Sequence, residues 1–295
     1  MSVRILHAAD LHLDSPFEAL TLAQAAQRRR EQRSLLRALP ELAQAHGAQI
    51  ILLAGDLLDS ASPYPETAKA LAETFDGCGA EVFLAPGNHD YYSAGVPYAR
   101  LTFPENVHIF RSPRIEAVTL PELGVRAGGT VYAWPGCMEG RGFDETGEKG
   151  VLLVDVAAGD VQARFVPVPG RRYEILRVDV TDTDPVQAAL AALPEGAARN
   201  IYRIVLTGET DRAPNPAALR AALEGRVFAL QLRDETRARR DLWARAGEGT
   251  LRGQFLAQLK QQYDAADSDR ARETIVMAAR WGLAALDHDE EVVTL

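Results

Sequence analysis

Short apolar runs alternate with helical patterns along the first half of the chain. Residues 3–8, 50–53 and 82–84 have the length and residue types of buried strands. Between the first two runs, apolar residues recur at helical spacing over residues 22–46, where Pro40 is expected to split or kink the helix. This alternation predicts an α/β fold.

The second half of the chain carries three further patterns. Two alternating apolar segments around residues 158–160 predict a β-hairpin, and the prolines and glycine of residues 167–170 predict a linker. Strand and helix alternate again up to residue 232, and the pattern becomes helical and charged from Asp241. We therefore expect three parts, which are residues 1–168, 169–237 and 238–295.

Composition narrows the class of protein. Of the 295 residues, 47% are hydrophobic and 25% are charged, which is ordinary for a globular protein. The net charge of −9 argues against a basic surface that binds nucleic acids non-specifically, although bound metals would offset the charge of a local acidic cluster. Two cysteines outside a Cys-x-x-Cys spacing, with no secretory pattern, predict free thiols and a cytoplasmic protein. No apolar run reaches bilayer length, so we expect no membrane anchor.

A basic run at Arg28, Arg29 and Arg30 falls within the first predicted helix. Such a run either contacts phosphates or forms an exposed helix face laced with charge. The exposed face is the commoner meaning, and we expect it here.

Polar clusters follow the three apolar runs of the first half. Asp10 and His12 follow the first, Asp56 the second, and Asn88 and His89 the third. Because open α/β sheets place their sites at the carboxyl ends of strands, these residues are metal-ligand candidates. Imidazole, carboxylate and amide donors suit divalent ions such as Mn²⁺, and one carboxylate can bridge two of them. Ordinary turns also use Asp, Asn and Gly, but three clusters in order, each after a strand, favour a metal site that hydrolyses phosphoesters.

The residues around these clusters resemble a known family. Residues 4–14, 53–59 and 85–90 are similar to the calcineurin-like metallophosphoesterases, and most of all to the SbcD-like bacterial DNA repair exonucleases. Residues 131–137 and 143–150 resemble the end of that nuclease domain. The resemblance implies a two-sheet sandwich flanked by helices, then a small α/β capping domain and C-terminal helices.

The resemblance also assigns metal ligands. Asp10 and His12 become ligands of a first metal, Asp56 the bridge, and Asn88 a ligand of a second metal. Two Mn²⁺ ions are expected from the family. These assignments come from the matching motifs and not from spacing alone.

The neighbouring residues receive roles in the same way. His89 becomes the catalytic histidine, which protonates the leaving oxygen or stabilises developing charge. Asp59 and Asp90 either orient His89 and the loops or are exposed turn residues that need no function.

One departure from the family pattern changes the expectation. Family members carry a later His-Gly pair and a Gly-His-x-His motif, whereas beyond His89 this chain has only His108, in a predicted strand, and His288, in an acidic stretch. The sequence indicates an internal deletion near residues 124–129, which we expect to truncate the sandwich and to leave strand edges unpaired. With fewer ligands we expect weak or single-metal occupancy and impaired hydrolysis.

The resemblance implies a metal-dependent phosphodiesterase that acts as a DNA exonuclease or repair nuclease subunit. Its expected partners are DNA and an SbcC-like coiled-coil ATPase docked on the C-terminal helices, although those helices can equally pack on their own chain. The sequence does not decide whether the chain forms a homodimer. Two other functions also stay open, namely an inactive binding or scaffold homologue and a phosphodiesterase acting on nucleotides.

Overall fold

The computed structural model describes residues 2–112, 118, 120, 123, 134–157, 160–239 and 241–287. The apparent deletion near residues 124–129 and His288 lie outside the described residues. The chain divides into two compact units. Unit 1 comprises Met1–Val178, Pro185–Leu206 and Pro216–Asp234, and unit 2 comprises Asp179–Asp184, Thr207–Asn215 and Glu235–Leu295. The three-part division expected from the sequence remains a prediction.

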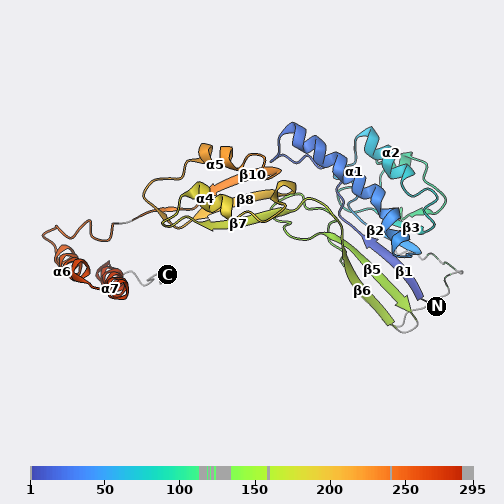
Figure 1. Ribbon diagram of the computed structural model, residues 1–295. Coiled ribbons are helices and arrows are strands. Elements are labelled where there is room, and N and C mark those ends of the chain that lie inside the picture. The colour runs from blue at the N-terminus through green and yellow to red at the C-terminus, as the bar shows by residue number, and fades with distance from the viewer. Residues whose placement is uncertain are drawn as a thin grey trace. The chain divides into compact units, whose positions relative to one another are not determined.

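A six-stranded sheet with the order β4-β3-β2-β1-β5-β6 forms the first part of unit 1 (Figure 1). The first four strands run parallel, and β5 is antiparallel to both β1 and β6. Helices separate the parallel strands along the chain. The elements are β1 (Ser2–Ala8), α1 (Leu22–Ala45), β2 (Ile50–Ala54), α2 (Pro65–Glu73), β3 (Glu81–Ala85), α3 (Pro97–Arg100), β4 (Val107–Ile109), β5 (Gly150–Ala157) and β6 (Asp160–Pro167).

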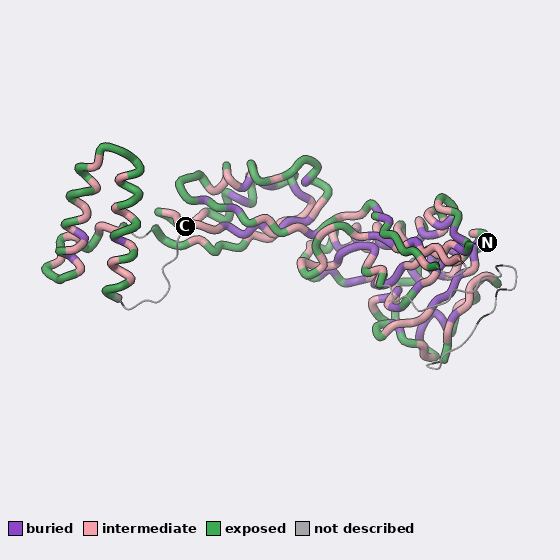
Figure 2. The backbone as a smooth tube through the Cα atoms, turned by 90° about the horizontal axis from the view of Figure 1, so that it is seen from below, coloured by how far each residue is buried: buried purple, intermediate pink, exposed green. Residues whose placement is uncertain are grey.

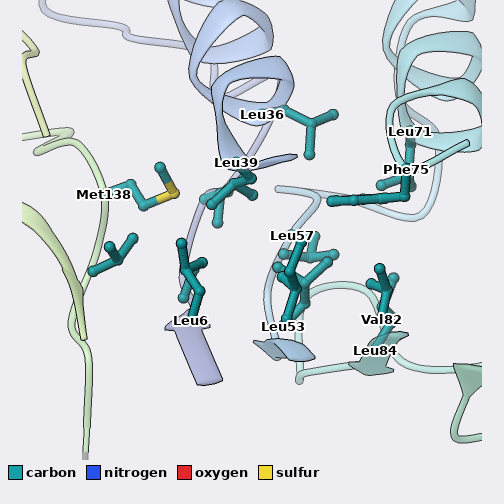
Figure 3. Packing of buried hydrophobic residues seen from close by; sticks show 14 of the residues in the cluster. Leu6, Leu36, Leu39, Leu53, Leu57, Leu71, Phe75, Val82, Leu84 and Met138 are labelled. Atoms are coloured by element: carbon teal, nitrogen blue, oxygen red, sulfur yellow. The ribbon is translucent and has the colours of Figure 1, made fainter. Parts of the chain in front are cut away.

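Helices α1 and α2 supply the apolar layer that covers one face of this sheet (Figure 3). Helix α1 begins at a capping box between Thr21 and Gln24, and it continues through Pro40 without being split. Alternate residues of each strand point toward the helices, as a period of two requires. The buried side chains that meet include Leu6, Leu53, Val82, Leu84, Leu36, Leu39, Leu71 and Phe75.

The α/β class is confirmed, but the described part of the chain does not show the expected two-sheet sandwich. The described strands of this region form one sheet, and part of the interval between β4 and β5 lies outside the described residues. On the sheet face opposite α1 and α2, several apolar side chains of the described strands are partly exposed. Ile5 and its partner Val154 are half-buried, and Phe165 on β6 is 44% exposed.

A smaller sheet completes unit 1, with the order β10-β8-β7 (Figure 1). Its strands alternate with two helices, as predicted for residues 173–232. Leu219 and Leu223 of α5 and Ile201 and Ile204 of β8 are buried. The elements are β7 (Tyr173–Asp179), α4 (Pro185–Ala191), η1 (Ala197–Arg199), β8 (Ile201–Thr207), α5 (Pro216–Leu223) and β10 (Ala229–Asp234).

Two buried or half-buried ion pairs connect α1 to the segments before β5 and after β6. The fully buried Arg28 pairs with Glu139 and donates to the Gly140 carbonyl oxygen. Arg171 donates through Nε and Nη2 to the Glu31 carboxylate at 2.8 and 2.7 Å. The expectation that the basic run is an exposed face is therefore wrong at Arg28, whose charge is needed to neutralise a buried glutamate.

Unit 2 is assembled from three separate stretches of the chain. A short parallel pair joins β9 (Glu209–Thr210) to β11 (Arg237–Ala238), and Arg239 forms ion pairs with Asp182 and Asp211. Helices α6 (Leu251–Ala265) and α7 (Asp269–Asp287) follow, and their residues are mostly exposed or half-buried (Figure 2). Of the helices in the described residues, none has the length and apolar character needed to cross a bilayer.

Candidate metal centre

Backbone hydrogen bonds join the loops that follow β1 and β2. The amide of Asp10 donates to the Gly55 carbonyl oxygen at 3.1 Å, and that of His12 donates to the Asp56 carbonyl oxygen at 2.9 Å. The pairing of β1 with β2 thus continues past the strand ends and into the polar clusters. This continuation brings Asp10, His12 and Asp56 together without any contribution from their side chains.

Asp90 fastens the loop after β3 to the loop after β2. Its side chain is fully buried, and one oxygen accepts from the Leu57 and Leu58 amides at 2.8 and 3.1 Å. The other oxygen accepts from the Gly87 amide at 2.6 Å, and the Tyr98 hydroxyl donates to the carboxylate at 2.5 Å. Asp90 is therefore not an exposed turn residue. It organises the loops, which was one of the two roles expected for it.

Glycine is required where these two loops touch. A Cβ on Gly87 would overlap both the side chain and the backbone of Asp56. Gly55 has a φ of +90°, and a Cβ there would also crowd the Gly87 Cα. The loops can approach this closely because both positions lack a side chain. The close contact allows the His89 amide to donate to Asp56 Oδ1 at 2.9 Å.

The side chains of Asp10, His12 and Asp56 converge on one point. His12 Nε2 lies 3.8 Å from Asp10 Oδ1 and 3.9 Å from Asp56 Oδ2. Two ligands that each lie about 2.1 Å from a shared ion can be up to about 4.2 Å apart, so these separations fit a single divalent cation. The three donors form one of two groups in the described residues with the composition and spacing of a metal site.

Backbone strain marks the same three residues. Asp10, His12 and Asp56 have φ values of 52°, 41° and 51°, in the left-handed region that residues with side chains rarely adopt. Such strain costs of order 1–3 kcal/mol per residue and persists only where surrounding contacts impose it. The continued strand pairing and the Asp90 hydrogen bonds are those contacts here.

The environment of the site favours a neutral imidazole. Burial, reinforced by the positive charge of Arg141, lowers the pKa of His12 below its ordinary value. Burial also raises the pKa of Asp10, and the neighbouring His12 partly offsets this. A neutral His12 is the form that can bind a cation.

Asp59 contacts both histidines of the site. Its Oδ1 lies 3.3 Å from His12 Nδ1, opposite the nitrogen that faces Asp10 and Asp56. Its backbone carbonyl oxygen lies 3.2 Å from His89 Nδ1. Asp59 thus contacts His89, which it was expected to orient, through its main chain. The carboxylate of Asp59 faces His12. A carboxylate on the far nitrogen of a metal-binding histidine fixes the orientation of the ring.

Asn88 and His89 are both exposed in the loop after β3. The rings of His89 and His12 meet edge to face, with centroids 4.7 Å apart, so His89 borders the donor cluster. Asn88 lies between His89 and Gly87, the two residues of this loop that contact Asp56. His108, by contrast, packs between Phe83 and Phe110 in β4, as expected of a structural histidine.

Sequence patterns did not identify several residues of this site. The buried Gln32 of α1 donates to the carbonyl oxygens of Leu11 and His12 at 3.2 and 3.1 Å. Arg141 and Glu145 bond to each other, and Arg141 Nη1 lies 3.7 Å from Asp59 Oδ1. Glutamine in a helix or arginine in a loop gives no signal by type or spacing, so only the fold could identify them.

The family of the larger sheet follows from comparison of this region with known proteins. Residues 3–148 match the family model described as calcineurin-like phosphoesterase. They form a calcineurin-like metallophosphoesterase domain. The matched range contains all the converging donors described above, and proteins of this family bind divalent metals and hydrolyse phosphoesters. The family expected from the sequence is thus confirmed.

Two relatives of this metallophosphoesterase domain carry informative names. The chain is 37% identical to the uncharacterized metallophosphoesterase YhaO of Bacillus subtilis (strain 168) over 113 residues, 36% of this chain and 27% of that protein. It is 28% identical to the SbcD subunit of the nuclease SbcCD of Rhodobacter capsulatus over 172 residues, 57% of this chain and 35% of that protein. The matches thus span about a quarter to a third of each relative's length.

Proposed function

We propose that this chain is a metal-dependent phosphodiesterase that degrades DNA. The convergence of Asp10, His12 and Asp56 beside an exposed histidine carries the proposal. The match to a nuclease subunit in Rhodobacter capsulatus supports DNA as the substrate. We propose Mn²⁺ as the metal, an SbcC-like coiled-coil ATPase as a partner and the cytoplasm as the location.

In the proposed reaction, each residue of the site has a separate role. Asp10, His12 and Asp56 would hold the cation, and the Asp59 carboxylate, 3.3 Å from His12 Nδ1, would orient the ring. A divalent cation there supplies charge neutralisation and an activated nucleophile. His89 Nδ1 lies 3.2 Å from the Asp59 carbonyl oxygen, so a His89 ring protonated on both nitrogens would give its Nε2 proton to the leaving oxygen and become neutral. Asn88 is proposed as a further ligand from its place in the motif.

Manganese-dependent hydrolysis of bis(p-nitrophenyl) phosphate tests this proposal. The wild-type chain should release p-nitrophenol, and Asp56→Ala and His89→Ala should reduce the rate by at least a hundredfold. Tyr91→Ala is a matched control, because Tyr91 is exposed in the same loop. Equal rates for wild type and Asp56→Ala would overturn the assignment. Turnover compared on duplex DNA, single strands and cyclic nucleotides separates a nuclease from a nucleotide phosphodiesterase.

A specific observation favours a second function. Asp10, His12 and Asp56 suffice for one cation, whereas among the described residues only Asp56 and the exposed Asn88 are assigned to the proposed second metal. A chain that keeps the fold but binds metal weakly would serve as a binding or scaffold subunit. No hydrolysis above the Asp56→Ala control, with metal still bound, would support that function over the enzyme.

A further inference from the structure

The loop that precedes β5 places the positively charged side chain of Arg141 near the metal centre. Cys137 forms a parallel bridge with Ala9, the residue before Asp10, so this loop begins beside the donor cluster. Arg141 follows in a tight turn, in which a Cβ on Gly140 would collide with the Glu145 carbonyl oxygen. The turn and its bridge thus hold Arg141 near the cluster by backbone contacts.

Glu145 fixes the guanidinium of Arg141. Its carboxylate accepts from the Arg141 backbone amide and from Nη2, each at 2.8 Å. Nη1 lies 3.7 Å from Asp59 Oδ1, and the same oxygen lies 3.3 Å from His12 Nδ1. One carboxylate therefore separates the guanidinium from the ring that binds the cation.

The guanidinium of Arg141 has more N–H groups than its contacts with Glu145 and Asp59 use. Guanidinium carries five N–H groups, and the contacts with Glu145 and Asp59 leave several of them unused. Among the described residues, Arg141 Nε is buried without a hydrogen-bond partner, so an incoming anion would meet the Nη atoms of a side chain that is 29% exposed as a whole. A group that is pre-positioned, partly open and short of acceptors is suited to bind an incoming anion.

The net charge of the site indicates which anion Arg141 would bind. The cluster contains the carboxylates of Asp10, Asp56, Asp59 and Glu145, so a single divalent cation leaves it negative. A phosphodiester brings another negative charge, which a dinuclear site meets with a second metal. Of the residues that the structure describes, Arg141 is a positive side chain in ion-pair contact with this cluster, through Asp59 and Glu145. Its planar fork matches the oxygens of a phosphate.

We propose that Arg141 is a catalytic residue that binds a non-bridging oxygen of the substrate phosphate, in the role a second metal has in a dinuclear site. This inference rests on the proposed phosphoesterase function and names how its substrate is held. The arginine adds hydrogen bonds and charge to the developing transition state and changes no bond itself.

Calorimetric titration with thymidine 5′-monophosphate tests the proposal without requiring turnover. Arg141→Gln should weaken binding at least tenfold in the Mn²⁺-loaded chain, and Arg141→Lys should weaken it less. Arg172→Gln is a matched control, because Arg172 also pairs with a glutamate, at 2.6 Å from Glu148, and should change nothing. Thymidine, which lacks the phosphate, should bind Arg141→Gln and wild type alike.

A second variant separates substrate binding from loop support. Glu145→Gln removes the acidic partner and leaves Arg141 in place, so nucleotide affinity should stay constant or rise. Equal losses in Glu145→Gln and Arg141→Gln would overturn the proposal, as would affinity for Arg141→Gln within twofold of wild type. Manganese stoichiometry, measured on each variant, should equal that of wild type.

The outcomes also distinguish this inference from the proposed function. A chain with Mn²⁺-dependent hydrolysis whose Arg141→Gln variant binds the nucleotide normally refutes the role of Arg141 alone. A chain that binds the nucleotide through Arg141 without any hydrolysis refutes the enzyme alone.

Discussion

At the scale of single residues, a buried carboxylate does more for this site than its position in a motif suggests. Asp90 binds no cation in our assignment, yet it accepts hydrogen bonds from two loops and from Tyr98. Burial, together with the charge of Asp90, raises the pKa of Tyr98 well above its usual value, so the hydroxyl remains a donor at any working pH. The geometry of the donors thus depends on a residue outside the donor set.

Replacing Asp90 tests this dependence. Asp90→Asn places an amide N–H against backbone donors and should lower the free energy of unfolding by about 2–4 kcal/mol. Tyr98→Phe removes one hydrogen bond and should cost less, about 1–2 kcal/mol. Urea denaturation of both variants in EDTA measures these losses. An Asp90→Asn variant as stable as wild type would show that the loops are held by other contacts.

Strain at Asp10 supports a second prediction of this kind. Its side chain is 44% exposed and its φ is 52°, so Asp10→Gly should relieve strain without opening a cavity. In EDTA we expect the unfolding free energy to rise by up to about 1 kcal/mol, while Mn²⁺ affinity falls.

Asp182→Gly is the matched control for that experiment. Asp182 also has a positive φ, of 59°, but lies in unit 2 and not among the metal donors. It should gain less stability, because Asp182 also pairs with Arg239, and its Mn²⁺ affinity should be unchanged. A loss of stability in Asp10→Gly alone would mean that its backbone is not strained.

At the scale of elements, the carboxylate of Glu31 links α1 to the segment before β7. Burial tends to raise the pKa of Glu31, but hydrogen bonds from Arg171, Gln27 and Arg28 together outweigh it and lower the pKa. A lowered folded-state pKa means that the ionised form is the one that stabilises the fold. Arg171 also lies over the ring of Phe228, at 3.7 Å from its centroid, so the link reaches the edge of β10.

The pH dependence of stability follows from this shift. Glu31 contributes stability above its unfolded pKa of about 4.3, and the contribution is lost as the pH falls through the lower folded pKa. Glu31→Gln should therefore cost about 1–2 kcal/mol at pH 7 and almost nothing below about pH 3. Glu41→Gln, an exposed position on the same helix, is the control and should show no such difference. Thermal unfolding between pH 3 and 7 measures both.

The elements of this chain were largely predictable from its sequence. The runs at residues 3–8 and 82–84 became β1 and β3, and the helix expected from residue 22 begins at Leu22. Period and capping are local properties, so the sequence alone carries them. Buried Arg28 was not predictable, because its partner Glu139 lies 111 residues away. The same reason hid Arg141 and Gln32, whose role depends on packing between distant segments.

At the scale of the whole molecule, the number of metal ions bound per chain is a property of the candidate site that can be measured directly. We expect one strongly bound Mn²⁺ per chain, because His12 belongs to both groups of converging donors in the described residues, one with Asp10 and Asp56 and the other with Asp59 and His89. At a free concentration of one hundred times Kd, that ion should raise the free energy of unfolding by about 2.7 kcal/mol. Calorimetric titration gives the stoichiometry, and two tight sites per chain would contradict this expectation.

Unit 2 has a consequence for synthesis on the ribosome. Residues 179–184 and 207–215 are translated before residues 235–295, with which they form a unit. Domains generally fold as they emerge, N-terminal parts first, so these two segments are made before their partners. A chain that ends at Asp234 and is released would expose both segments to proteases, whereas one that ends at Asp287 would contain every described residue of the unit.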